Sequence, residues 1–167
     1  MTRGGVVEYL AVFLVSLLPV AEVRGSIPMV FVLFKDGESI AYGLAVAVVG
    51  NLLVAPIVLT ALRWLDTLII NSRTIPTVMK RVYTRVIGYG RSRSSRVNRY
   101  SLLALALFVA LPLPGTGAWT GSLVAHVLGI SRRRALIAIE LGVLIASLIV
   151  SLASALGVEL IRRIFLL

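Results

Sequence analysis

The sequence predicts an all-α integral membrane protein with two inverted repeats, each a re-entrant helical hairpin followed by one transmembrane helix. A basic amphipathic cytoplasmic connector joins the repeats. The composition predicts the membrane class, because 59% of the 167 residues are hydrophobic and 14% are charged, whereas soluble domains are about 45–50% apolar and about 25% charged. Two long apolar stretches predict the spans, and two shorter ones with polar interruptions predict the hairpins. We expect one membrane domain over residues 1–167.

Two apolar stretches are long enough to cross a bilayer. Residues 40–62 carry no charge, and residues 135–158 carry only Glu140. At about 1.5 Å per residue each helix reaches about 35 Å, and the hydrocarbon core of a bilayer is about 30 Å thick. Ser39 and Ser131 stand where an N-cap is expected.

The remaining apolar stretches form two interrupted pairs, over residues 5–34 and 101–130. The first pair is broken by segment 22–28 and the second by segment 112–117. Irregular backbone at membrane depth is tolerated where it is buried in protein or lines a wet cavity. We therefore expect two re-entrant hairpins whose turns meet near the bilayer midplane.

The two halves follow one plan, with Pro19 matching Pro112 and Gly37 matching Gly129. Each unit enters and leaves on one side and then crosses once. An odd number of crossings places the second unit upside down relative to the first, which is the inverted repeat seen in many transporters.

The net charge of +10 is concentrated in two segments. The connector, residues 63–100, carries a net charge of +8 and residues 132–134 add +3, whereas all other charges sum to −1. Cytoplasmic loops carry the excess of Lys and Arg. This pattern predicts a multi-pass protein of the plasma membrane with both basic segments in the cytoplasm and both termini outside.

The connector contains apolar residues at three- and four-residue spacing, which predicts a basic amphipathic helix at the cytoplasmic headgroup level. The apolar positions are Ile75, Val78, Met79, Val82, Tyr83, Val86 and Ile87. A solvated or partner-packed helix is the alternative. Residues 88–99, rich in Ser, Gly and Arg, are expected to form a mobile loop.

The sequence lacks the residues that several classes of function require. The chain has no cysteine and one histidine, His126, so thiol chemistry is excluded and a histidine metal site is not expected. No nucleophile–base pair indicates an enzyme, and no cofactor is expected. The basic run lacks the aromatic platform of single-strand binding, so nucleic acid is not expected as a partner.

Glu22 and Arg24 are the sharpest functional candidates, because ionisable residues at membrane depth are costly and face a cavity or a partner. In one interpretation Glu22 exchanges a proton or cation while Arg24 attracts an anionic headgroup. In the other, the two residues form an ion pair that holds the hairpin. Gly25 and Pro28 belong to the same predicted turn.

The second turn offers hydroxyls and backbone amides instead of charges, and N–H groups at a helix start favour an anion. Its candidate residues are Pro114, Gly115, Thr116, Gly117, Trp119 and Thr120. Close packing of two hairpin tips is the alternative, and Trp119 is expected as an interfacial anchor or a cavity wall.

One face of the first span carries Gly43, Ala47, Asn51 and Ala55. Such small residues are typical of a helix packing face. Asn51 is also a candidate to bond the opposing turn.

Two segments, EVRGSIP at 22–28 and LPGTGAWTGS at 113–122, resemble the putative small multidrug export protein family, which is similar to the wider DedA (VTT-domain) superfamily. The spacing of Gly43, Ala47 and Asn51 resembles a helix motif of DedA proteins. The resemblance implies opposed re-entrant hairpins and transport. DedA relatives are associated with flipping undecaprenyl-phosphate-type carriers or scrambling phospholipids, with proton coupling, and their turns carry acids and arginines that Glu22 and Arg24 match.

Three functions follow as expectations. The first is a DedA-like transporter that moves a phosphorylated isoprenoid carrier or a phospholipid between leaflets, with anionic phosphate headgroups and protons as partners. The second is an efflux transporter for small amphipathic or cationic compounds, with Glu22 as the binding acid. The third is a non-transporting membrane scaffold. A homodimer is plausible for a chain with so few helices.

Overall fold

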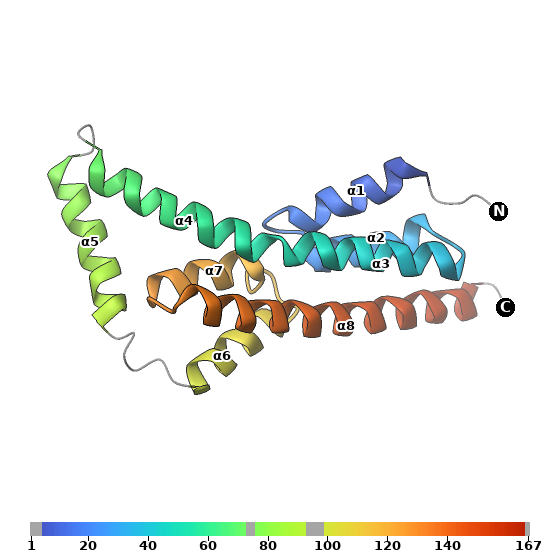
Figure 1. Cartoon of the computed structure of the whole chain (residues 1–167). Helices are drawn as coiled ribbons and strands as arrows, with labels where there is room; N and C mark the ends of the chain where they lie inside the picture. The colour runs from blue at the N-terminus through green and yellow to red at the C-terminus, as the bar shows by residue number, and fades with distance from the viewer. Residues whose placement is uncertain (1–4, 73–75, 93–98, 166–167) are drawn as a thin grey trace.

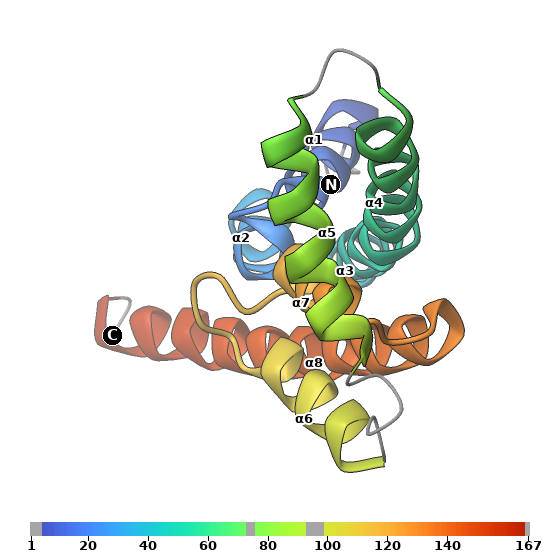
Figure 2. The ribbon, with the colours of Figure 1, turned by 90° about the vertical axis from the view of Figure 1, so that its left-hand side faces the viewer.

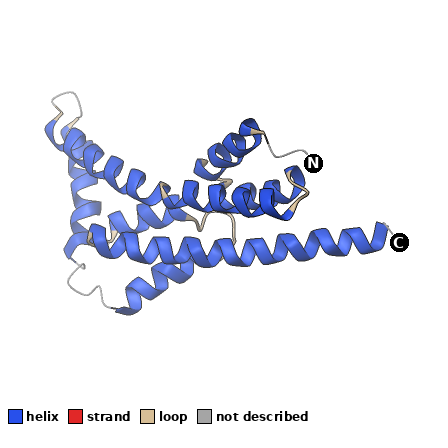
Figure 3. Cartoon of the chain, turned by 45° about the vertical axis from the view of Figure 1, so that its right-hand side comes forward, coloured by secondary structure: helices blue, strands red, loops and turns tan. Residues whose placement is uncertain are grey.

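The computed structural model describes residues 5–72, 76–92 and 99–165, and every regular element in these ranges is an α-helix (Figures 1 and 3). The helices are α1 (Val6–Leu17), α2 (Glu22–Leu33), α3 (Gly37–Leu52), α4 (Val54–Asn71), α5 (Thr77–Ser92), α6 (Arg99–Ala110), α7 (Ala118–Val127) and α8 (Arg132–Phe165). The prediction of an all-α protein is confirmed.

Two long apolar helical segments stand out, Gly37–Asn71 and Arg132–Leu160, with 35 and 29 residues. Each contains one predicted span and extends beyond it, so that α4 continues into the predicted connector. Within the most apolar 18-residue stretch of each segment, only 39% and 44% is buried inside the protein. Most of their apolar surface therefore faces outward, which indicates a membrane protein and not the core helices of a soluble one.

The first long segment is not one straight helix, because α3 and α4 are separated at Leu53. Pro56 follows three residues later and has no N–H to donate to the carbonyl of Leu52, one turn earlier, which its ring also crowds. The break therefore falls where the proline removes a helix bond.

The chain reverses between α1 and α2 and again between α6 and α7, and both reversals lie in the middle of the molecule (Figure 1). The second reversal, at 111–117, matches the prediction. The first was expected at 22–28 and lies at 18–21, so that α2 begins at Glu22 and contains Pro28. The proline removes only the bond to the carbonyl of Arg24, and the buried face of α2 offsets that loss.

The packing is centred on α2 and α8. Helix α2 packs against α1, α3 and α8, while α6 and α7 pack against α8, and α4 packs against α7. The face of α3–α4 that carries Gly43, Ala47, Asn51 and Ala55 is buried, which confirms it as a packing face. A stacked pair, Tyr9 and Phe34, with ring centroids 4.7 Å apart, joins α1 to the end of α2.

The start of α3 differs from the prediction. The N-cap is Asp36 and not Ser39, because the Asp36 carboxylate accepts a hydrogen bond of 2.9 Å from the backbone N–H of Ser39. The hydrogen bonds that Ser39 donates lower the pKa of Asp36. Ser131 does precede α8, and its carbonyl accepts from the N–H of Ala135 at 2.9 Å.

Helix α5 runs across the end of the molecule opposite the two termini (Figure 2). Ile87 is buried, whereas Val78, Met79 and Val82 are exposed. The expected start at Ile75 lies outside the described residues. The loop expected at 88–99 is helical up to Ser92, and residues 93–98 lie outside the described part.

Candidate functional site

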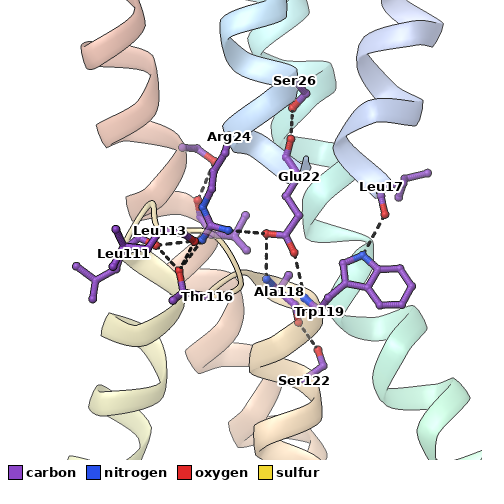
Figure 4. Close-up of polar contacts among 12 residues, drawn as sticks. Leu17, Glu22, Arg24, Ser26, Leu111, Leu113, Thr116, Ala118, Trp119 and Ser122 are labelled. Atoms are coloured by element: carbon purple, nitrogen blue, oxygen red, sulfur yellow. Dashed lines mark hydrogen bonds and ion pairs between the residues drawn. The ribbon is translucent and has the colours of Figure 1, made fainter. Parts of the chain in front are cut away.

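The two chain reversals contact each other through Glu22, the first residue of α2 (Figure 4). Glu22 is 2% exposed, and its φ of 46° lies in the left-handed region that side-chain-bearing residues rarely adopt. Such backbone strain persists only where the surroundings fix it, and it clusters at functional sites. The fold therefore holds this carboxylate in place against a local conformational preference.

The Glu22 carboxylate caps the N-terminus of α7. Its Oε2 accepts from the N–H of Ala118 at 3.3 Å, and its Oε1 accepts from the N–H of Trp119 at 3.2 Å. The N-cap residue of α7, Gly117, has no side chain with which to accept these bonds. A residue 96 positions away in the sequence therefore supplies the negative charge that a helix N-terminus favours.

Arg24 makes the complementary contact with the end of α6. Its Nη2 donates to the carbonyl of Leu111 at 3.0 Å and to Oγ1 of Thr116 at 2.9 Å. Leu111 directly follows α6, and cations are favourable at a helix C-terminus. Its Nη1 lies 3.7 Å from Oε2 of Glu22. The charges of Glu22 and Arg24 are thus neutralised largely by the facing ends of α7 and α6.

Two further side chains of the second hairpin complete the contact. The Thr116 hydroxyl lies 2.6 Å from the carbonyl of Leu111 and 2.8 Å from that of Leu113. The indole Nε1–H of Trp119 donates to the carbonyl of Leu17, the last residue of α1, at 3.0 Å. Trp119 therefore connects α7 to the end of α1.

The Glu22 carboxylate approaches Gly117 so closely that an added side chain would displace it. A Cβ added there would lie 1.6 Å from Oε2 of Glu22. Gly115 has a φ of 81°, so that the turn after α6 needs glycine for its backbone conformation. Both glycines serve the contact between the hairpins.

The structure brings Glu22, Arg24, Thr116, Gly117 and Trp119 together. In the described part of the chain, five other predicted site residues form no hydrogen bond between the two chain reversals. They are Gly25, Pro28, Asn51, Pro114 and Thr120. Asn51 is fully buried, and neither its Oδ1 nor its Nδ2 has a partner among the described residues. In the described part of the chain, Asn51 thus makes no hydrogen bond to the opposing turn, for which it was a candidate.

A second polar cluster, which the sequence did not indicate, joins α4, α5 and α7. The Tyr83 hydroxyl donates to Oδ1 of Asp66, and Nε2 of His126 lies 3.2 Å from the same oxygen. Asp66 is 9% exposed. The sequence carried no local signal for the acidic partner of His126, because Asp66 is 60 positions away.

The central arrangement is suited to holding and exchanging a cation or proton. It contains one buried carboxylate whose ionised form is stabilised by two amides and a guanidinium. Neutralising that carboxylate would remove the charge that binds the start of α7. Among the described residues no group of three potential metal-ligating side chains occurs.

Comparison with known proteins identifies the family. Residues 22–149 match the family described as putative small multi-drug export protein, and this range begins at Glu22 and contains the second chain reversal, at 111–117. The chain matches no curated protein and no solved structure. Because the family model covers well over half of its length, the chain belongs to the putative small multi-drug export protein family.

Proposed function

We propose that this protein is a membrane transporter that exports small amphipathic or cationic compounds, with Glu22 as the acid that binds the cation or a proton. One observation carries the proposal: a single buried carboxylate joins the two chain reversals by capping α7. The family description points to the same class of function.

Neutralising Glu22 provides the coupling step. Hydrogen bonds to a charged group contribute about 1.5–3 kcal/mol each, so that loss of the negative charge weakens the capping of α7 by several kcal/mol. An equilibrium between two arrangements moves from 1:99 to 99:1 with about 5.5 kcal/mol. Binding of a proton or cation at Glu22 therefore has the magnitude needed to separate the hairpins and open the site.

The proposal includes the membrane arrangement. The helix pairs α1–α2 and α6–α7 are re-entrant hairpins of two inverted repeats, and the long helical segments cross the bilayer. Transporters built from inverted repeats bind substrate near the midplane, where broken helices meet. The basic connector and Arg132 to Arg134 face the cytoplasm, and the termini face outward, in a plasma membrane.

The test is transport in proteoliposomes containing the purified full-length chain and a pH gradient, with ethidium and tetraphenylphosphonium as cationic probes. We expect substrate-dependent proton flux for the native chain and loss of at least 90% of it in Glu22→Gln. Glu38→Gln, which removes an acid from the exposed start of α3, is the matched control and retains the native rate. Equal rates for native chain and Glu22→Gln would contradict the proposal.

A second function is favoured by the amides of Ala118 and Trp119, which form an anion site at the start of α7. A phosphate headgroup that displaces Glu22 from these amides would also meet Arg24. This is the mechanism that DedA relatives suggest, namely proton-coupled flipping of a phosphorylated isoprenoid carrier or a phospholipid. A fluorescent-lipid flip assay distinguishes it, since it requires lipid movement that Glu22→Gln and Arg24→Ala abolish.

A further inference from the structure

A second polar site lies away from the hairpin contact, where α4, α7 and α8 meet. It is an open cavity of about 410 Å³, lined by Arg63 of α4, His126 of α7, Arg132 of α8 and the segment 129–131. Its charged lining residues are the two arginines, with no acid among them. The cavity is therefore an electropositive recess suited to an anion.

Two of the lining side chains, Arg132 and His126, are held by contacts with neighbouring residues. Nη2 of Arg132 donates to Oγ1 of Thr60 at 2.9 Å, which orients a guanidinium that has further N–H donors to offer. His126 is fixed by Asp66, which also accepts from Tyr83. Asp66 does not line the cavity. Arg132 and His126 thus have defined positions at the recess, whereas the Arg63 side chain is exposed.

An apolar groove adjoins this cavity and shares Arg132 with it. The groove measures about 580 Å³ and is lined by Pro56, Ile57, Thr60, Ala61 and Trp64 in addition to Arg132. Ile57 is 54% exposed and Trp64 is 66% exposed. Tryptophan is enriched at the level of lipid headgroups. An amphipathic molecule can therefore place its anionic end in the cavity and its apolar chain in the groove.

We propose that the cavity and the groove together bind one anionic phospholipid, with its phosphate between Arg63 and Arg132 and an acyl chain along Ile57 and Trp64. Charge complementarity selects the headgroup, since guanidinium groups bind phosphate oxygens through paired hydrogen bonds. The groove selects a lipid over free phosphate. The site is separate from Glu22 and Arg24 and does not depend on the transport proposed above.

Native mass spectrometry of the full-length chain in detergent tests the proposal, with phosphatidylglycerol, phosphatidylcholine and inorganic phosphate as probes. We expect one phosphatidylglycerol per chain, bound about tenfold more tightly than phosphatidylcholine, and no binding of inorganic phosphate at the same concentration. Binding of inorganic phosphate as tight as that of the lipid would overturn the proposal, because the groove would then contribute nothing.

Two variants and a neighbouring control locate the site. Arg63→Gln and Arg132→Gln should each weaken phosphatidylglycerol binding about tenfold, as expected for loss of one charge-assisted contact. Arg133→Gln, an exposed position beside Arg132 outside the cavity, should bind normally. The Arg63 side chain is exposed and has no hydrogen bond to a described residue, so its variant should fold as the native chain does.

Equal binding by Arg63→Gln and Arg133→Gln would overturn the assignment. Arg24→Gln separates this site from the contact at Glu22, because it should keep the native affinity for phosphatidylglycerol. A loss of lipid binding in Arg24→Gln would place the lipid at the contact between α2 and the second chain reversal and would contradict a separate site.

Discussion

At the scale of single residues, the charges of Glu22 and Arg24 depend more on the ends of α7 and α6 than on each other. Glu22 and Arg24 are 3.7 Å apart, whereas their contacts with backbone groups are between 3.0 and 3.3 Å. A buried ion pair alone does not recover its desolvation penalty without further hydrogen bonds. Amides at the start of α7 and a carbonyl at the end of α6 provide these bonds. The two interpretations of the pair are therefore not exclusive: the contact that holds the hairpins is also the one that titration would release.

Gly117→Ala is the sharpest test at this scale. The added methyl would overlap Oε2 of Glu22, with 1.6 Å between the atoms, and would force the carboxylate away from both amides. Loss of two hydrogen bonds to a charged group predicts destabilisation by about 3 kcal/mol or more, together with loss of transport. Thermal unfolding followed by circular dichroism in detergent measures the first effect.

Gly157→Ala is the control for that experiment, since a Cβ at position 157 meets nothing within 4 Å. It should leave stability unchanged or slightly higher, because alanine is the better helix former. If Gly117→Ala unfolded at the same temperature as the native protein, Glu22 would not be what holds α2 against α7.

At the scale of helices, the accuracy of the prediction followed the density of helix-breaking residues. The turn between α6 and α7 contains two prolines and two glycines within 111–117, and its position was predicted correctly. The first turn contains only Pro19, whereas Gly25 and Pro28, which indicated a break, lie inside α2. Burial of Val23, Ile27 and Val30 overrides the local preference, and that burial depends on neighbours distant in sequence.

The sequence singled out Glu22, Arg24 and Trp119 one by one, but it did not indicate how they contact the rest of the chain. The acid and the arginine could be selected because such side chains are rare in apolar segments. Their partners are mainly backbone groups about 90 positions away. Because almost every residue carries the same backbone groups, the sequence does not indicate which of them act as partners. The absence of a capping side chain at Gly117 was the one available signal that α7 takes its cap from elsewhere.

The start of α3 gives a prediction with a defined pH direction. The pKa of Asp36 is lowered from 3.8 mainly by the hydrogen bond from the Ser39 amide. A lowered folded-state pKa adds stability that is fully present above the unfolded-state value and is lost as the pH falls through the folded-state value. The cap should therefore weaken only below about pH 3.8.

Comparing melting temperatures of native protein and Asp36→Asn between pH 6 and pH 2 measures this effect, because all other acids titrate in both. Asparagine caps helices well without a charge, so the native protein should lose stability relative to Asp36→Asn below that pH. A constant difference across the range would exclude a contribution from the Asp36 charge. Asp36→Ala should be the least stable at pH 6.

At the scale of the whole molecule, the basic helix α5 and the chain termini lie at opposite ends. The N-terminus and the C-terminus lie together at one end, and α5 with its basic residues crosses the other (Figure 1). The cavity between Arg63 and Arg132 is formed by α4, α7 and α8, and the Asp66–Tyr83–His126 cluster joins α4, α5 and α7. Both therefore lie toward the α5 end. Contacts with anionic headgroups are thus expected at one surface only.

Single cysteines test this orientation directly, because the chain has none of its own. Glu38→Cys, near the termini, should react with a membrane-impermeant maleimide added outside intact cells. Thr84→Cys, on α5, should react only after the membrane is made permeable. The reverse pattern would contradict the orientation predicted from the basic segments, and labelling of both sites from outside would contradict two separated surfaces.

The capping of α7 by Glu22 also sets a threshold for any anion that enters from outside. A group attached to the chain and held in position acts as a competitor at a local concentration of millimolar or more. A free anion must exceed that local concentration to bind the amides of Ala118 and Trp119. A proton or cation needs only to neutralise the Glu22 carboxylate. Under the proposed mechanism, a negatively charged ligand would reach these amides only after Glu22 is neutralised, so that occupancy of the amides would report the charge on one residue.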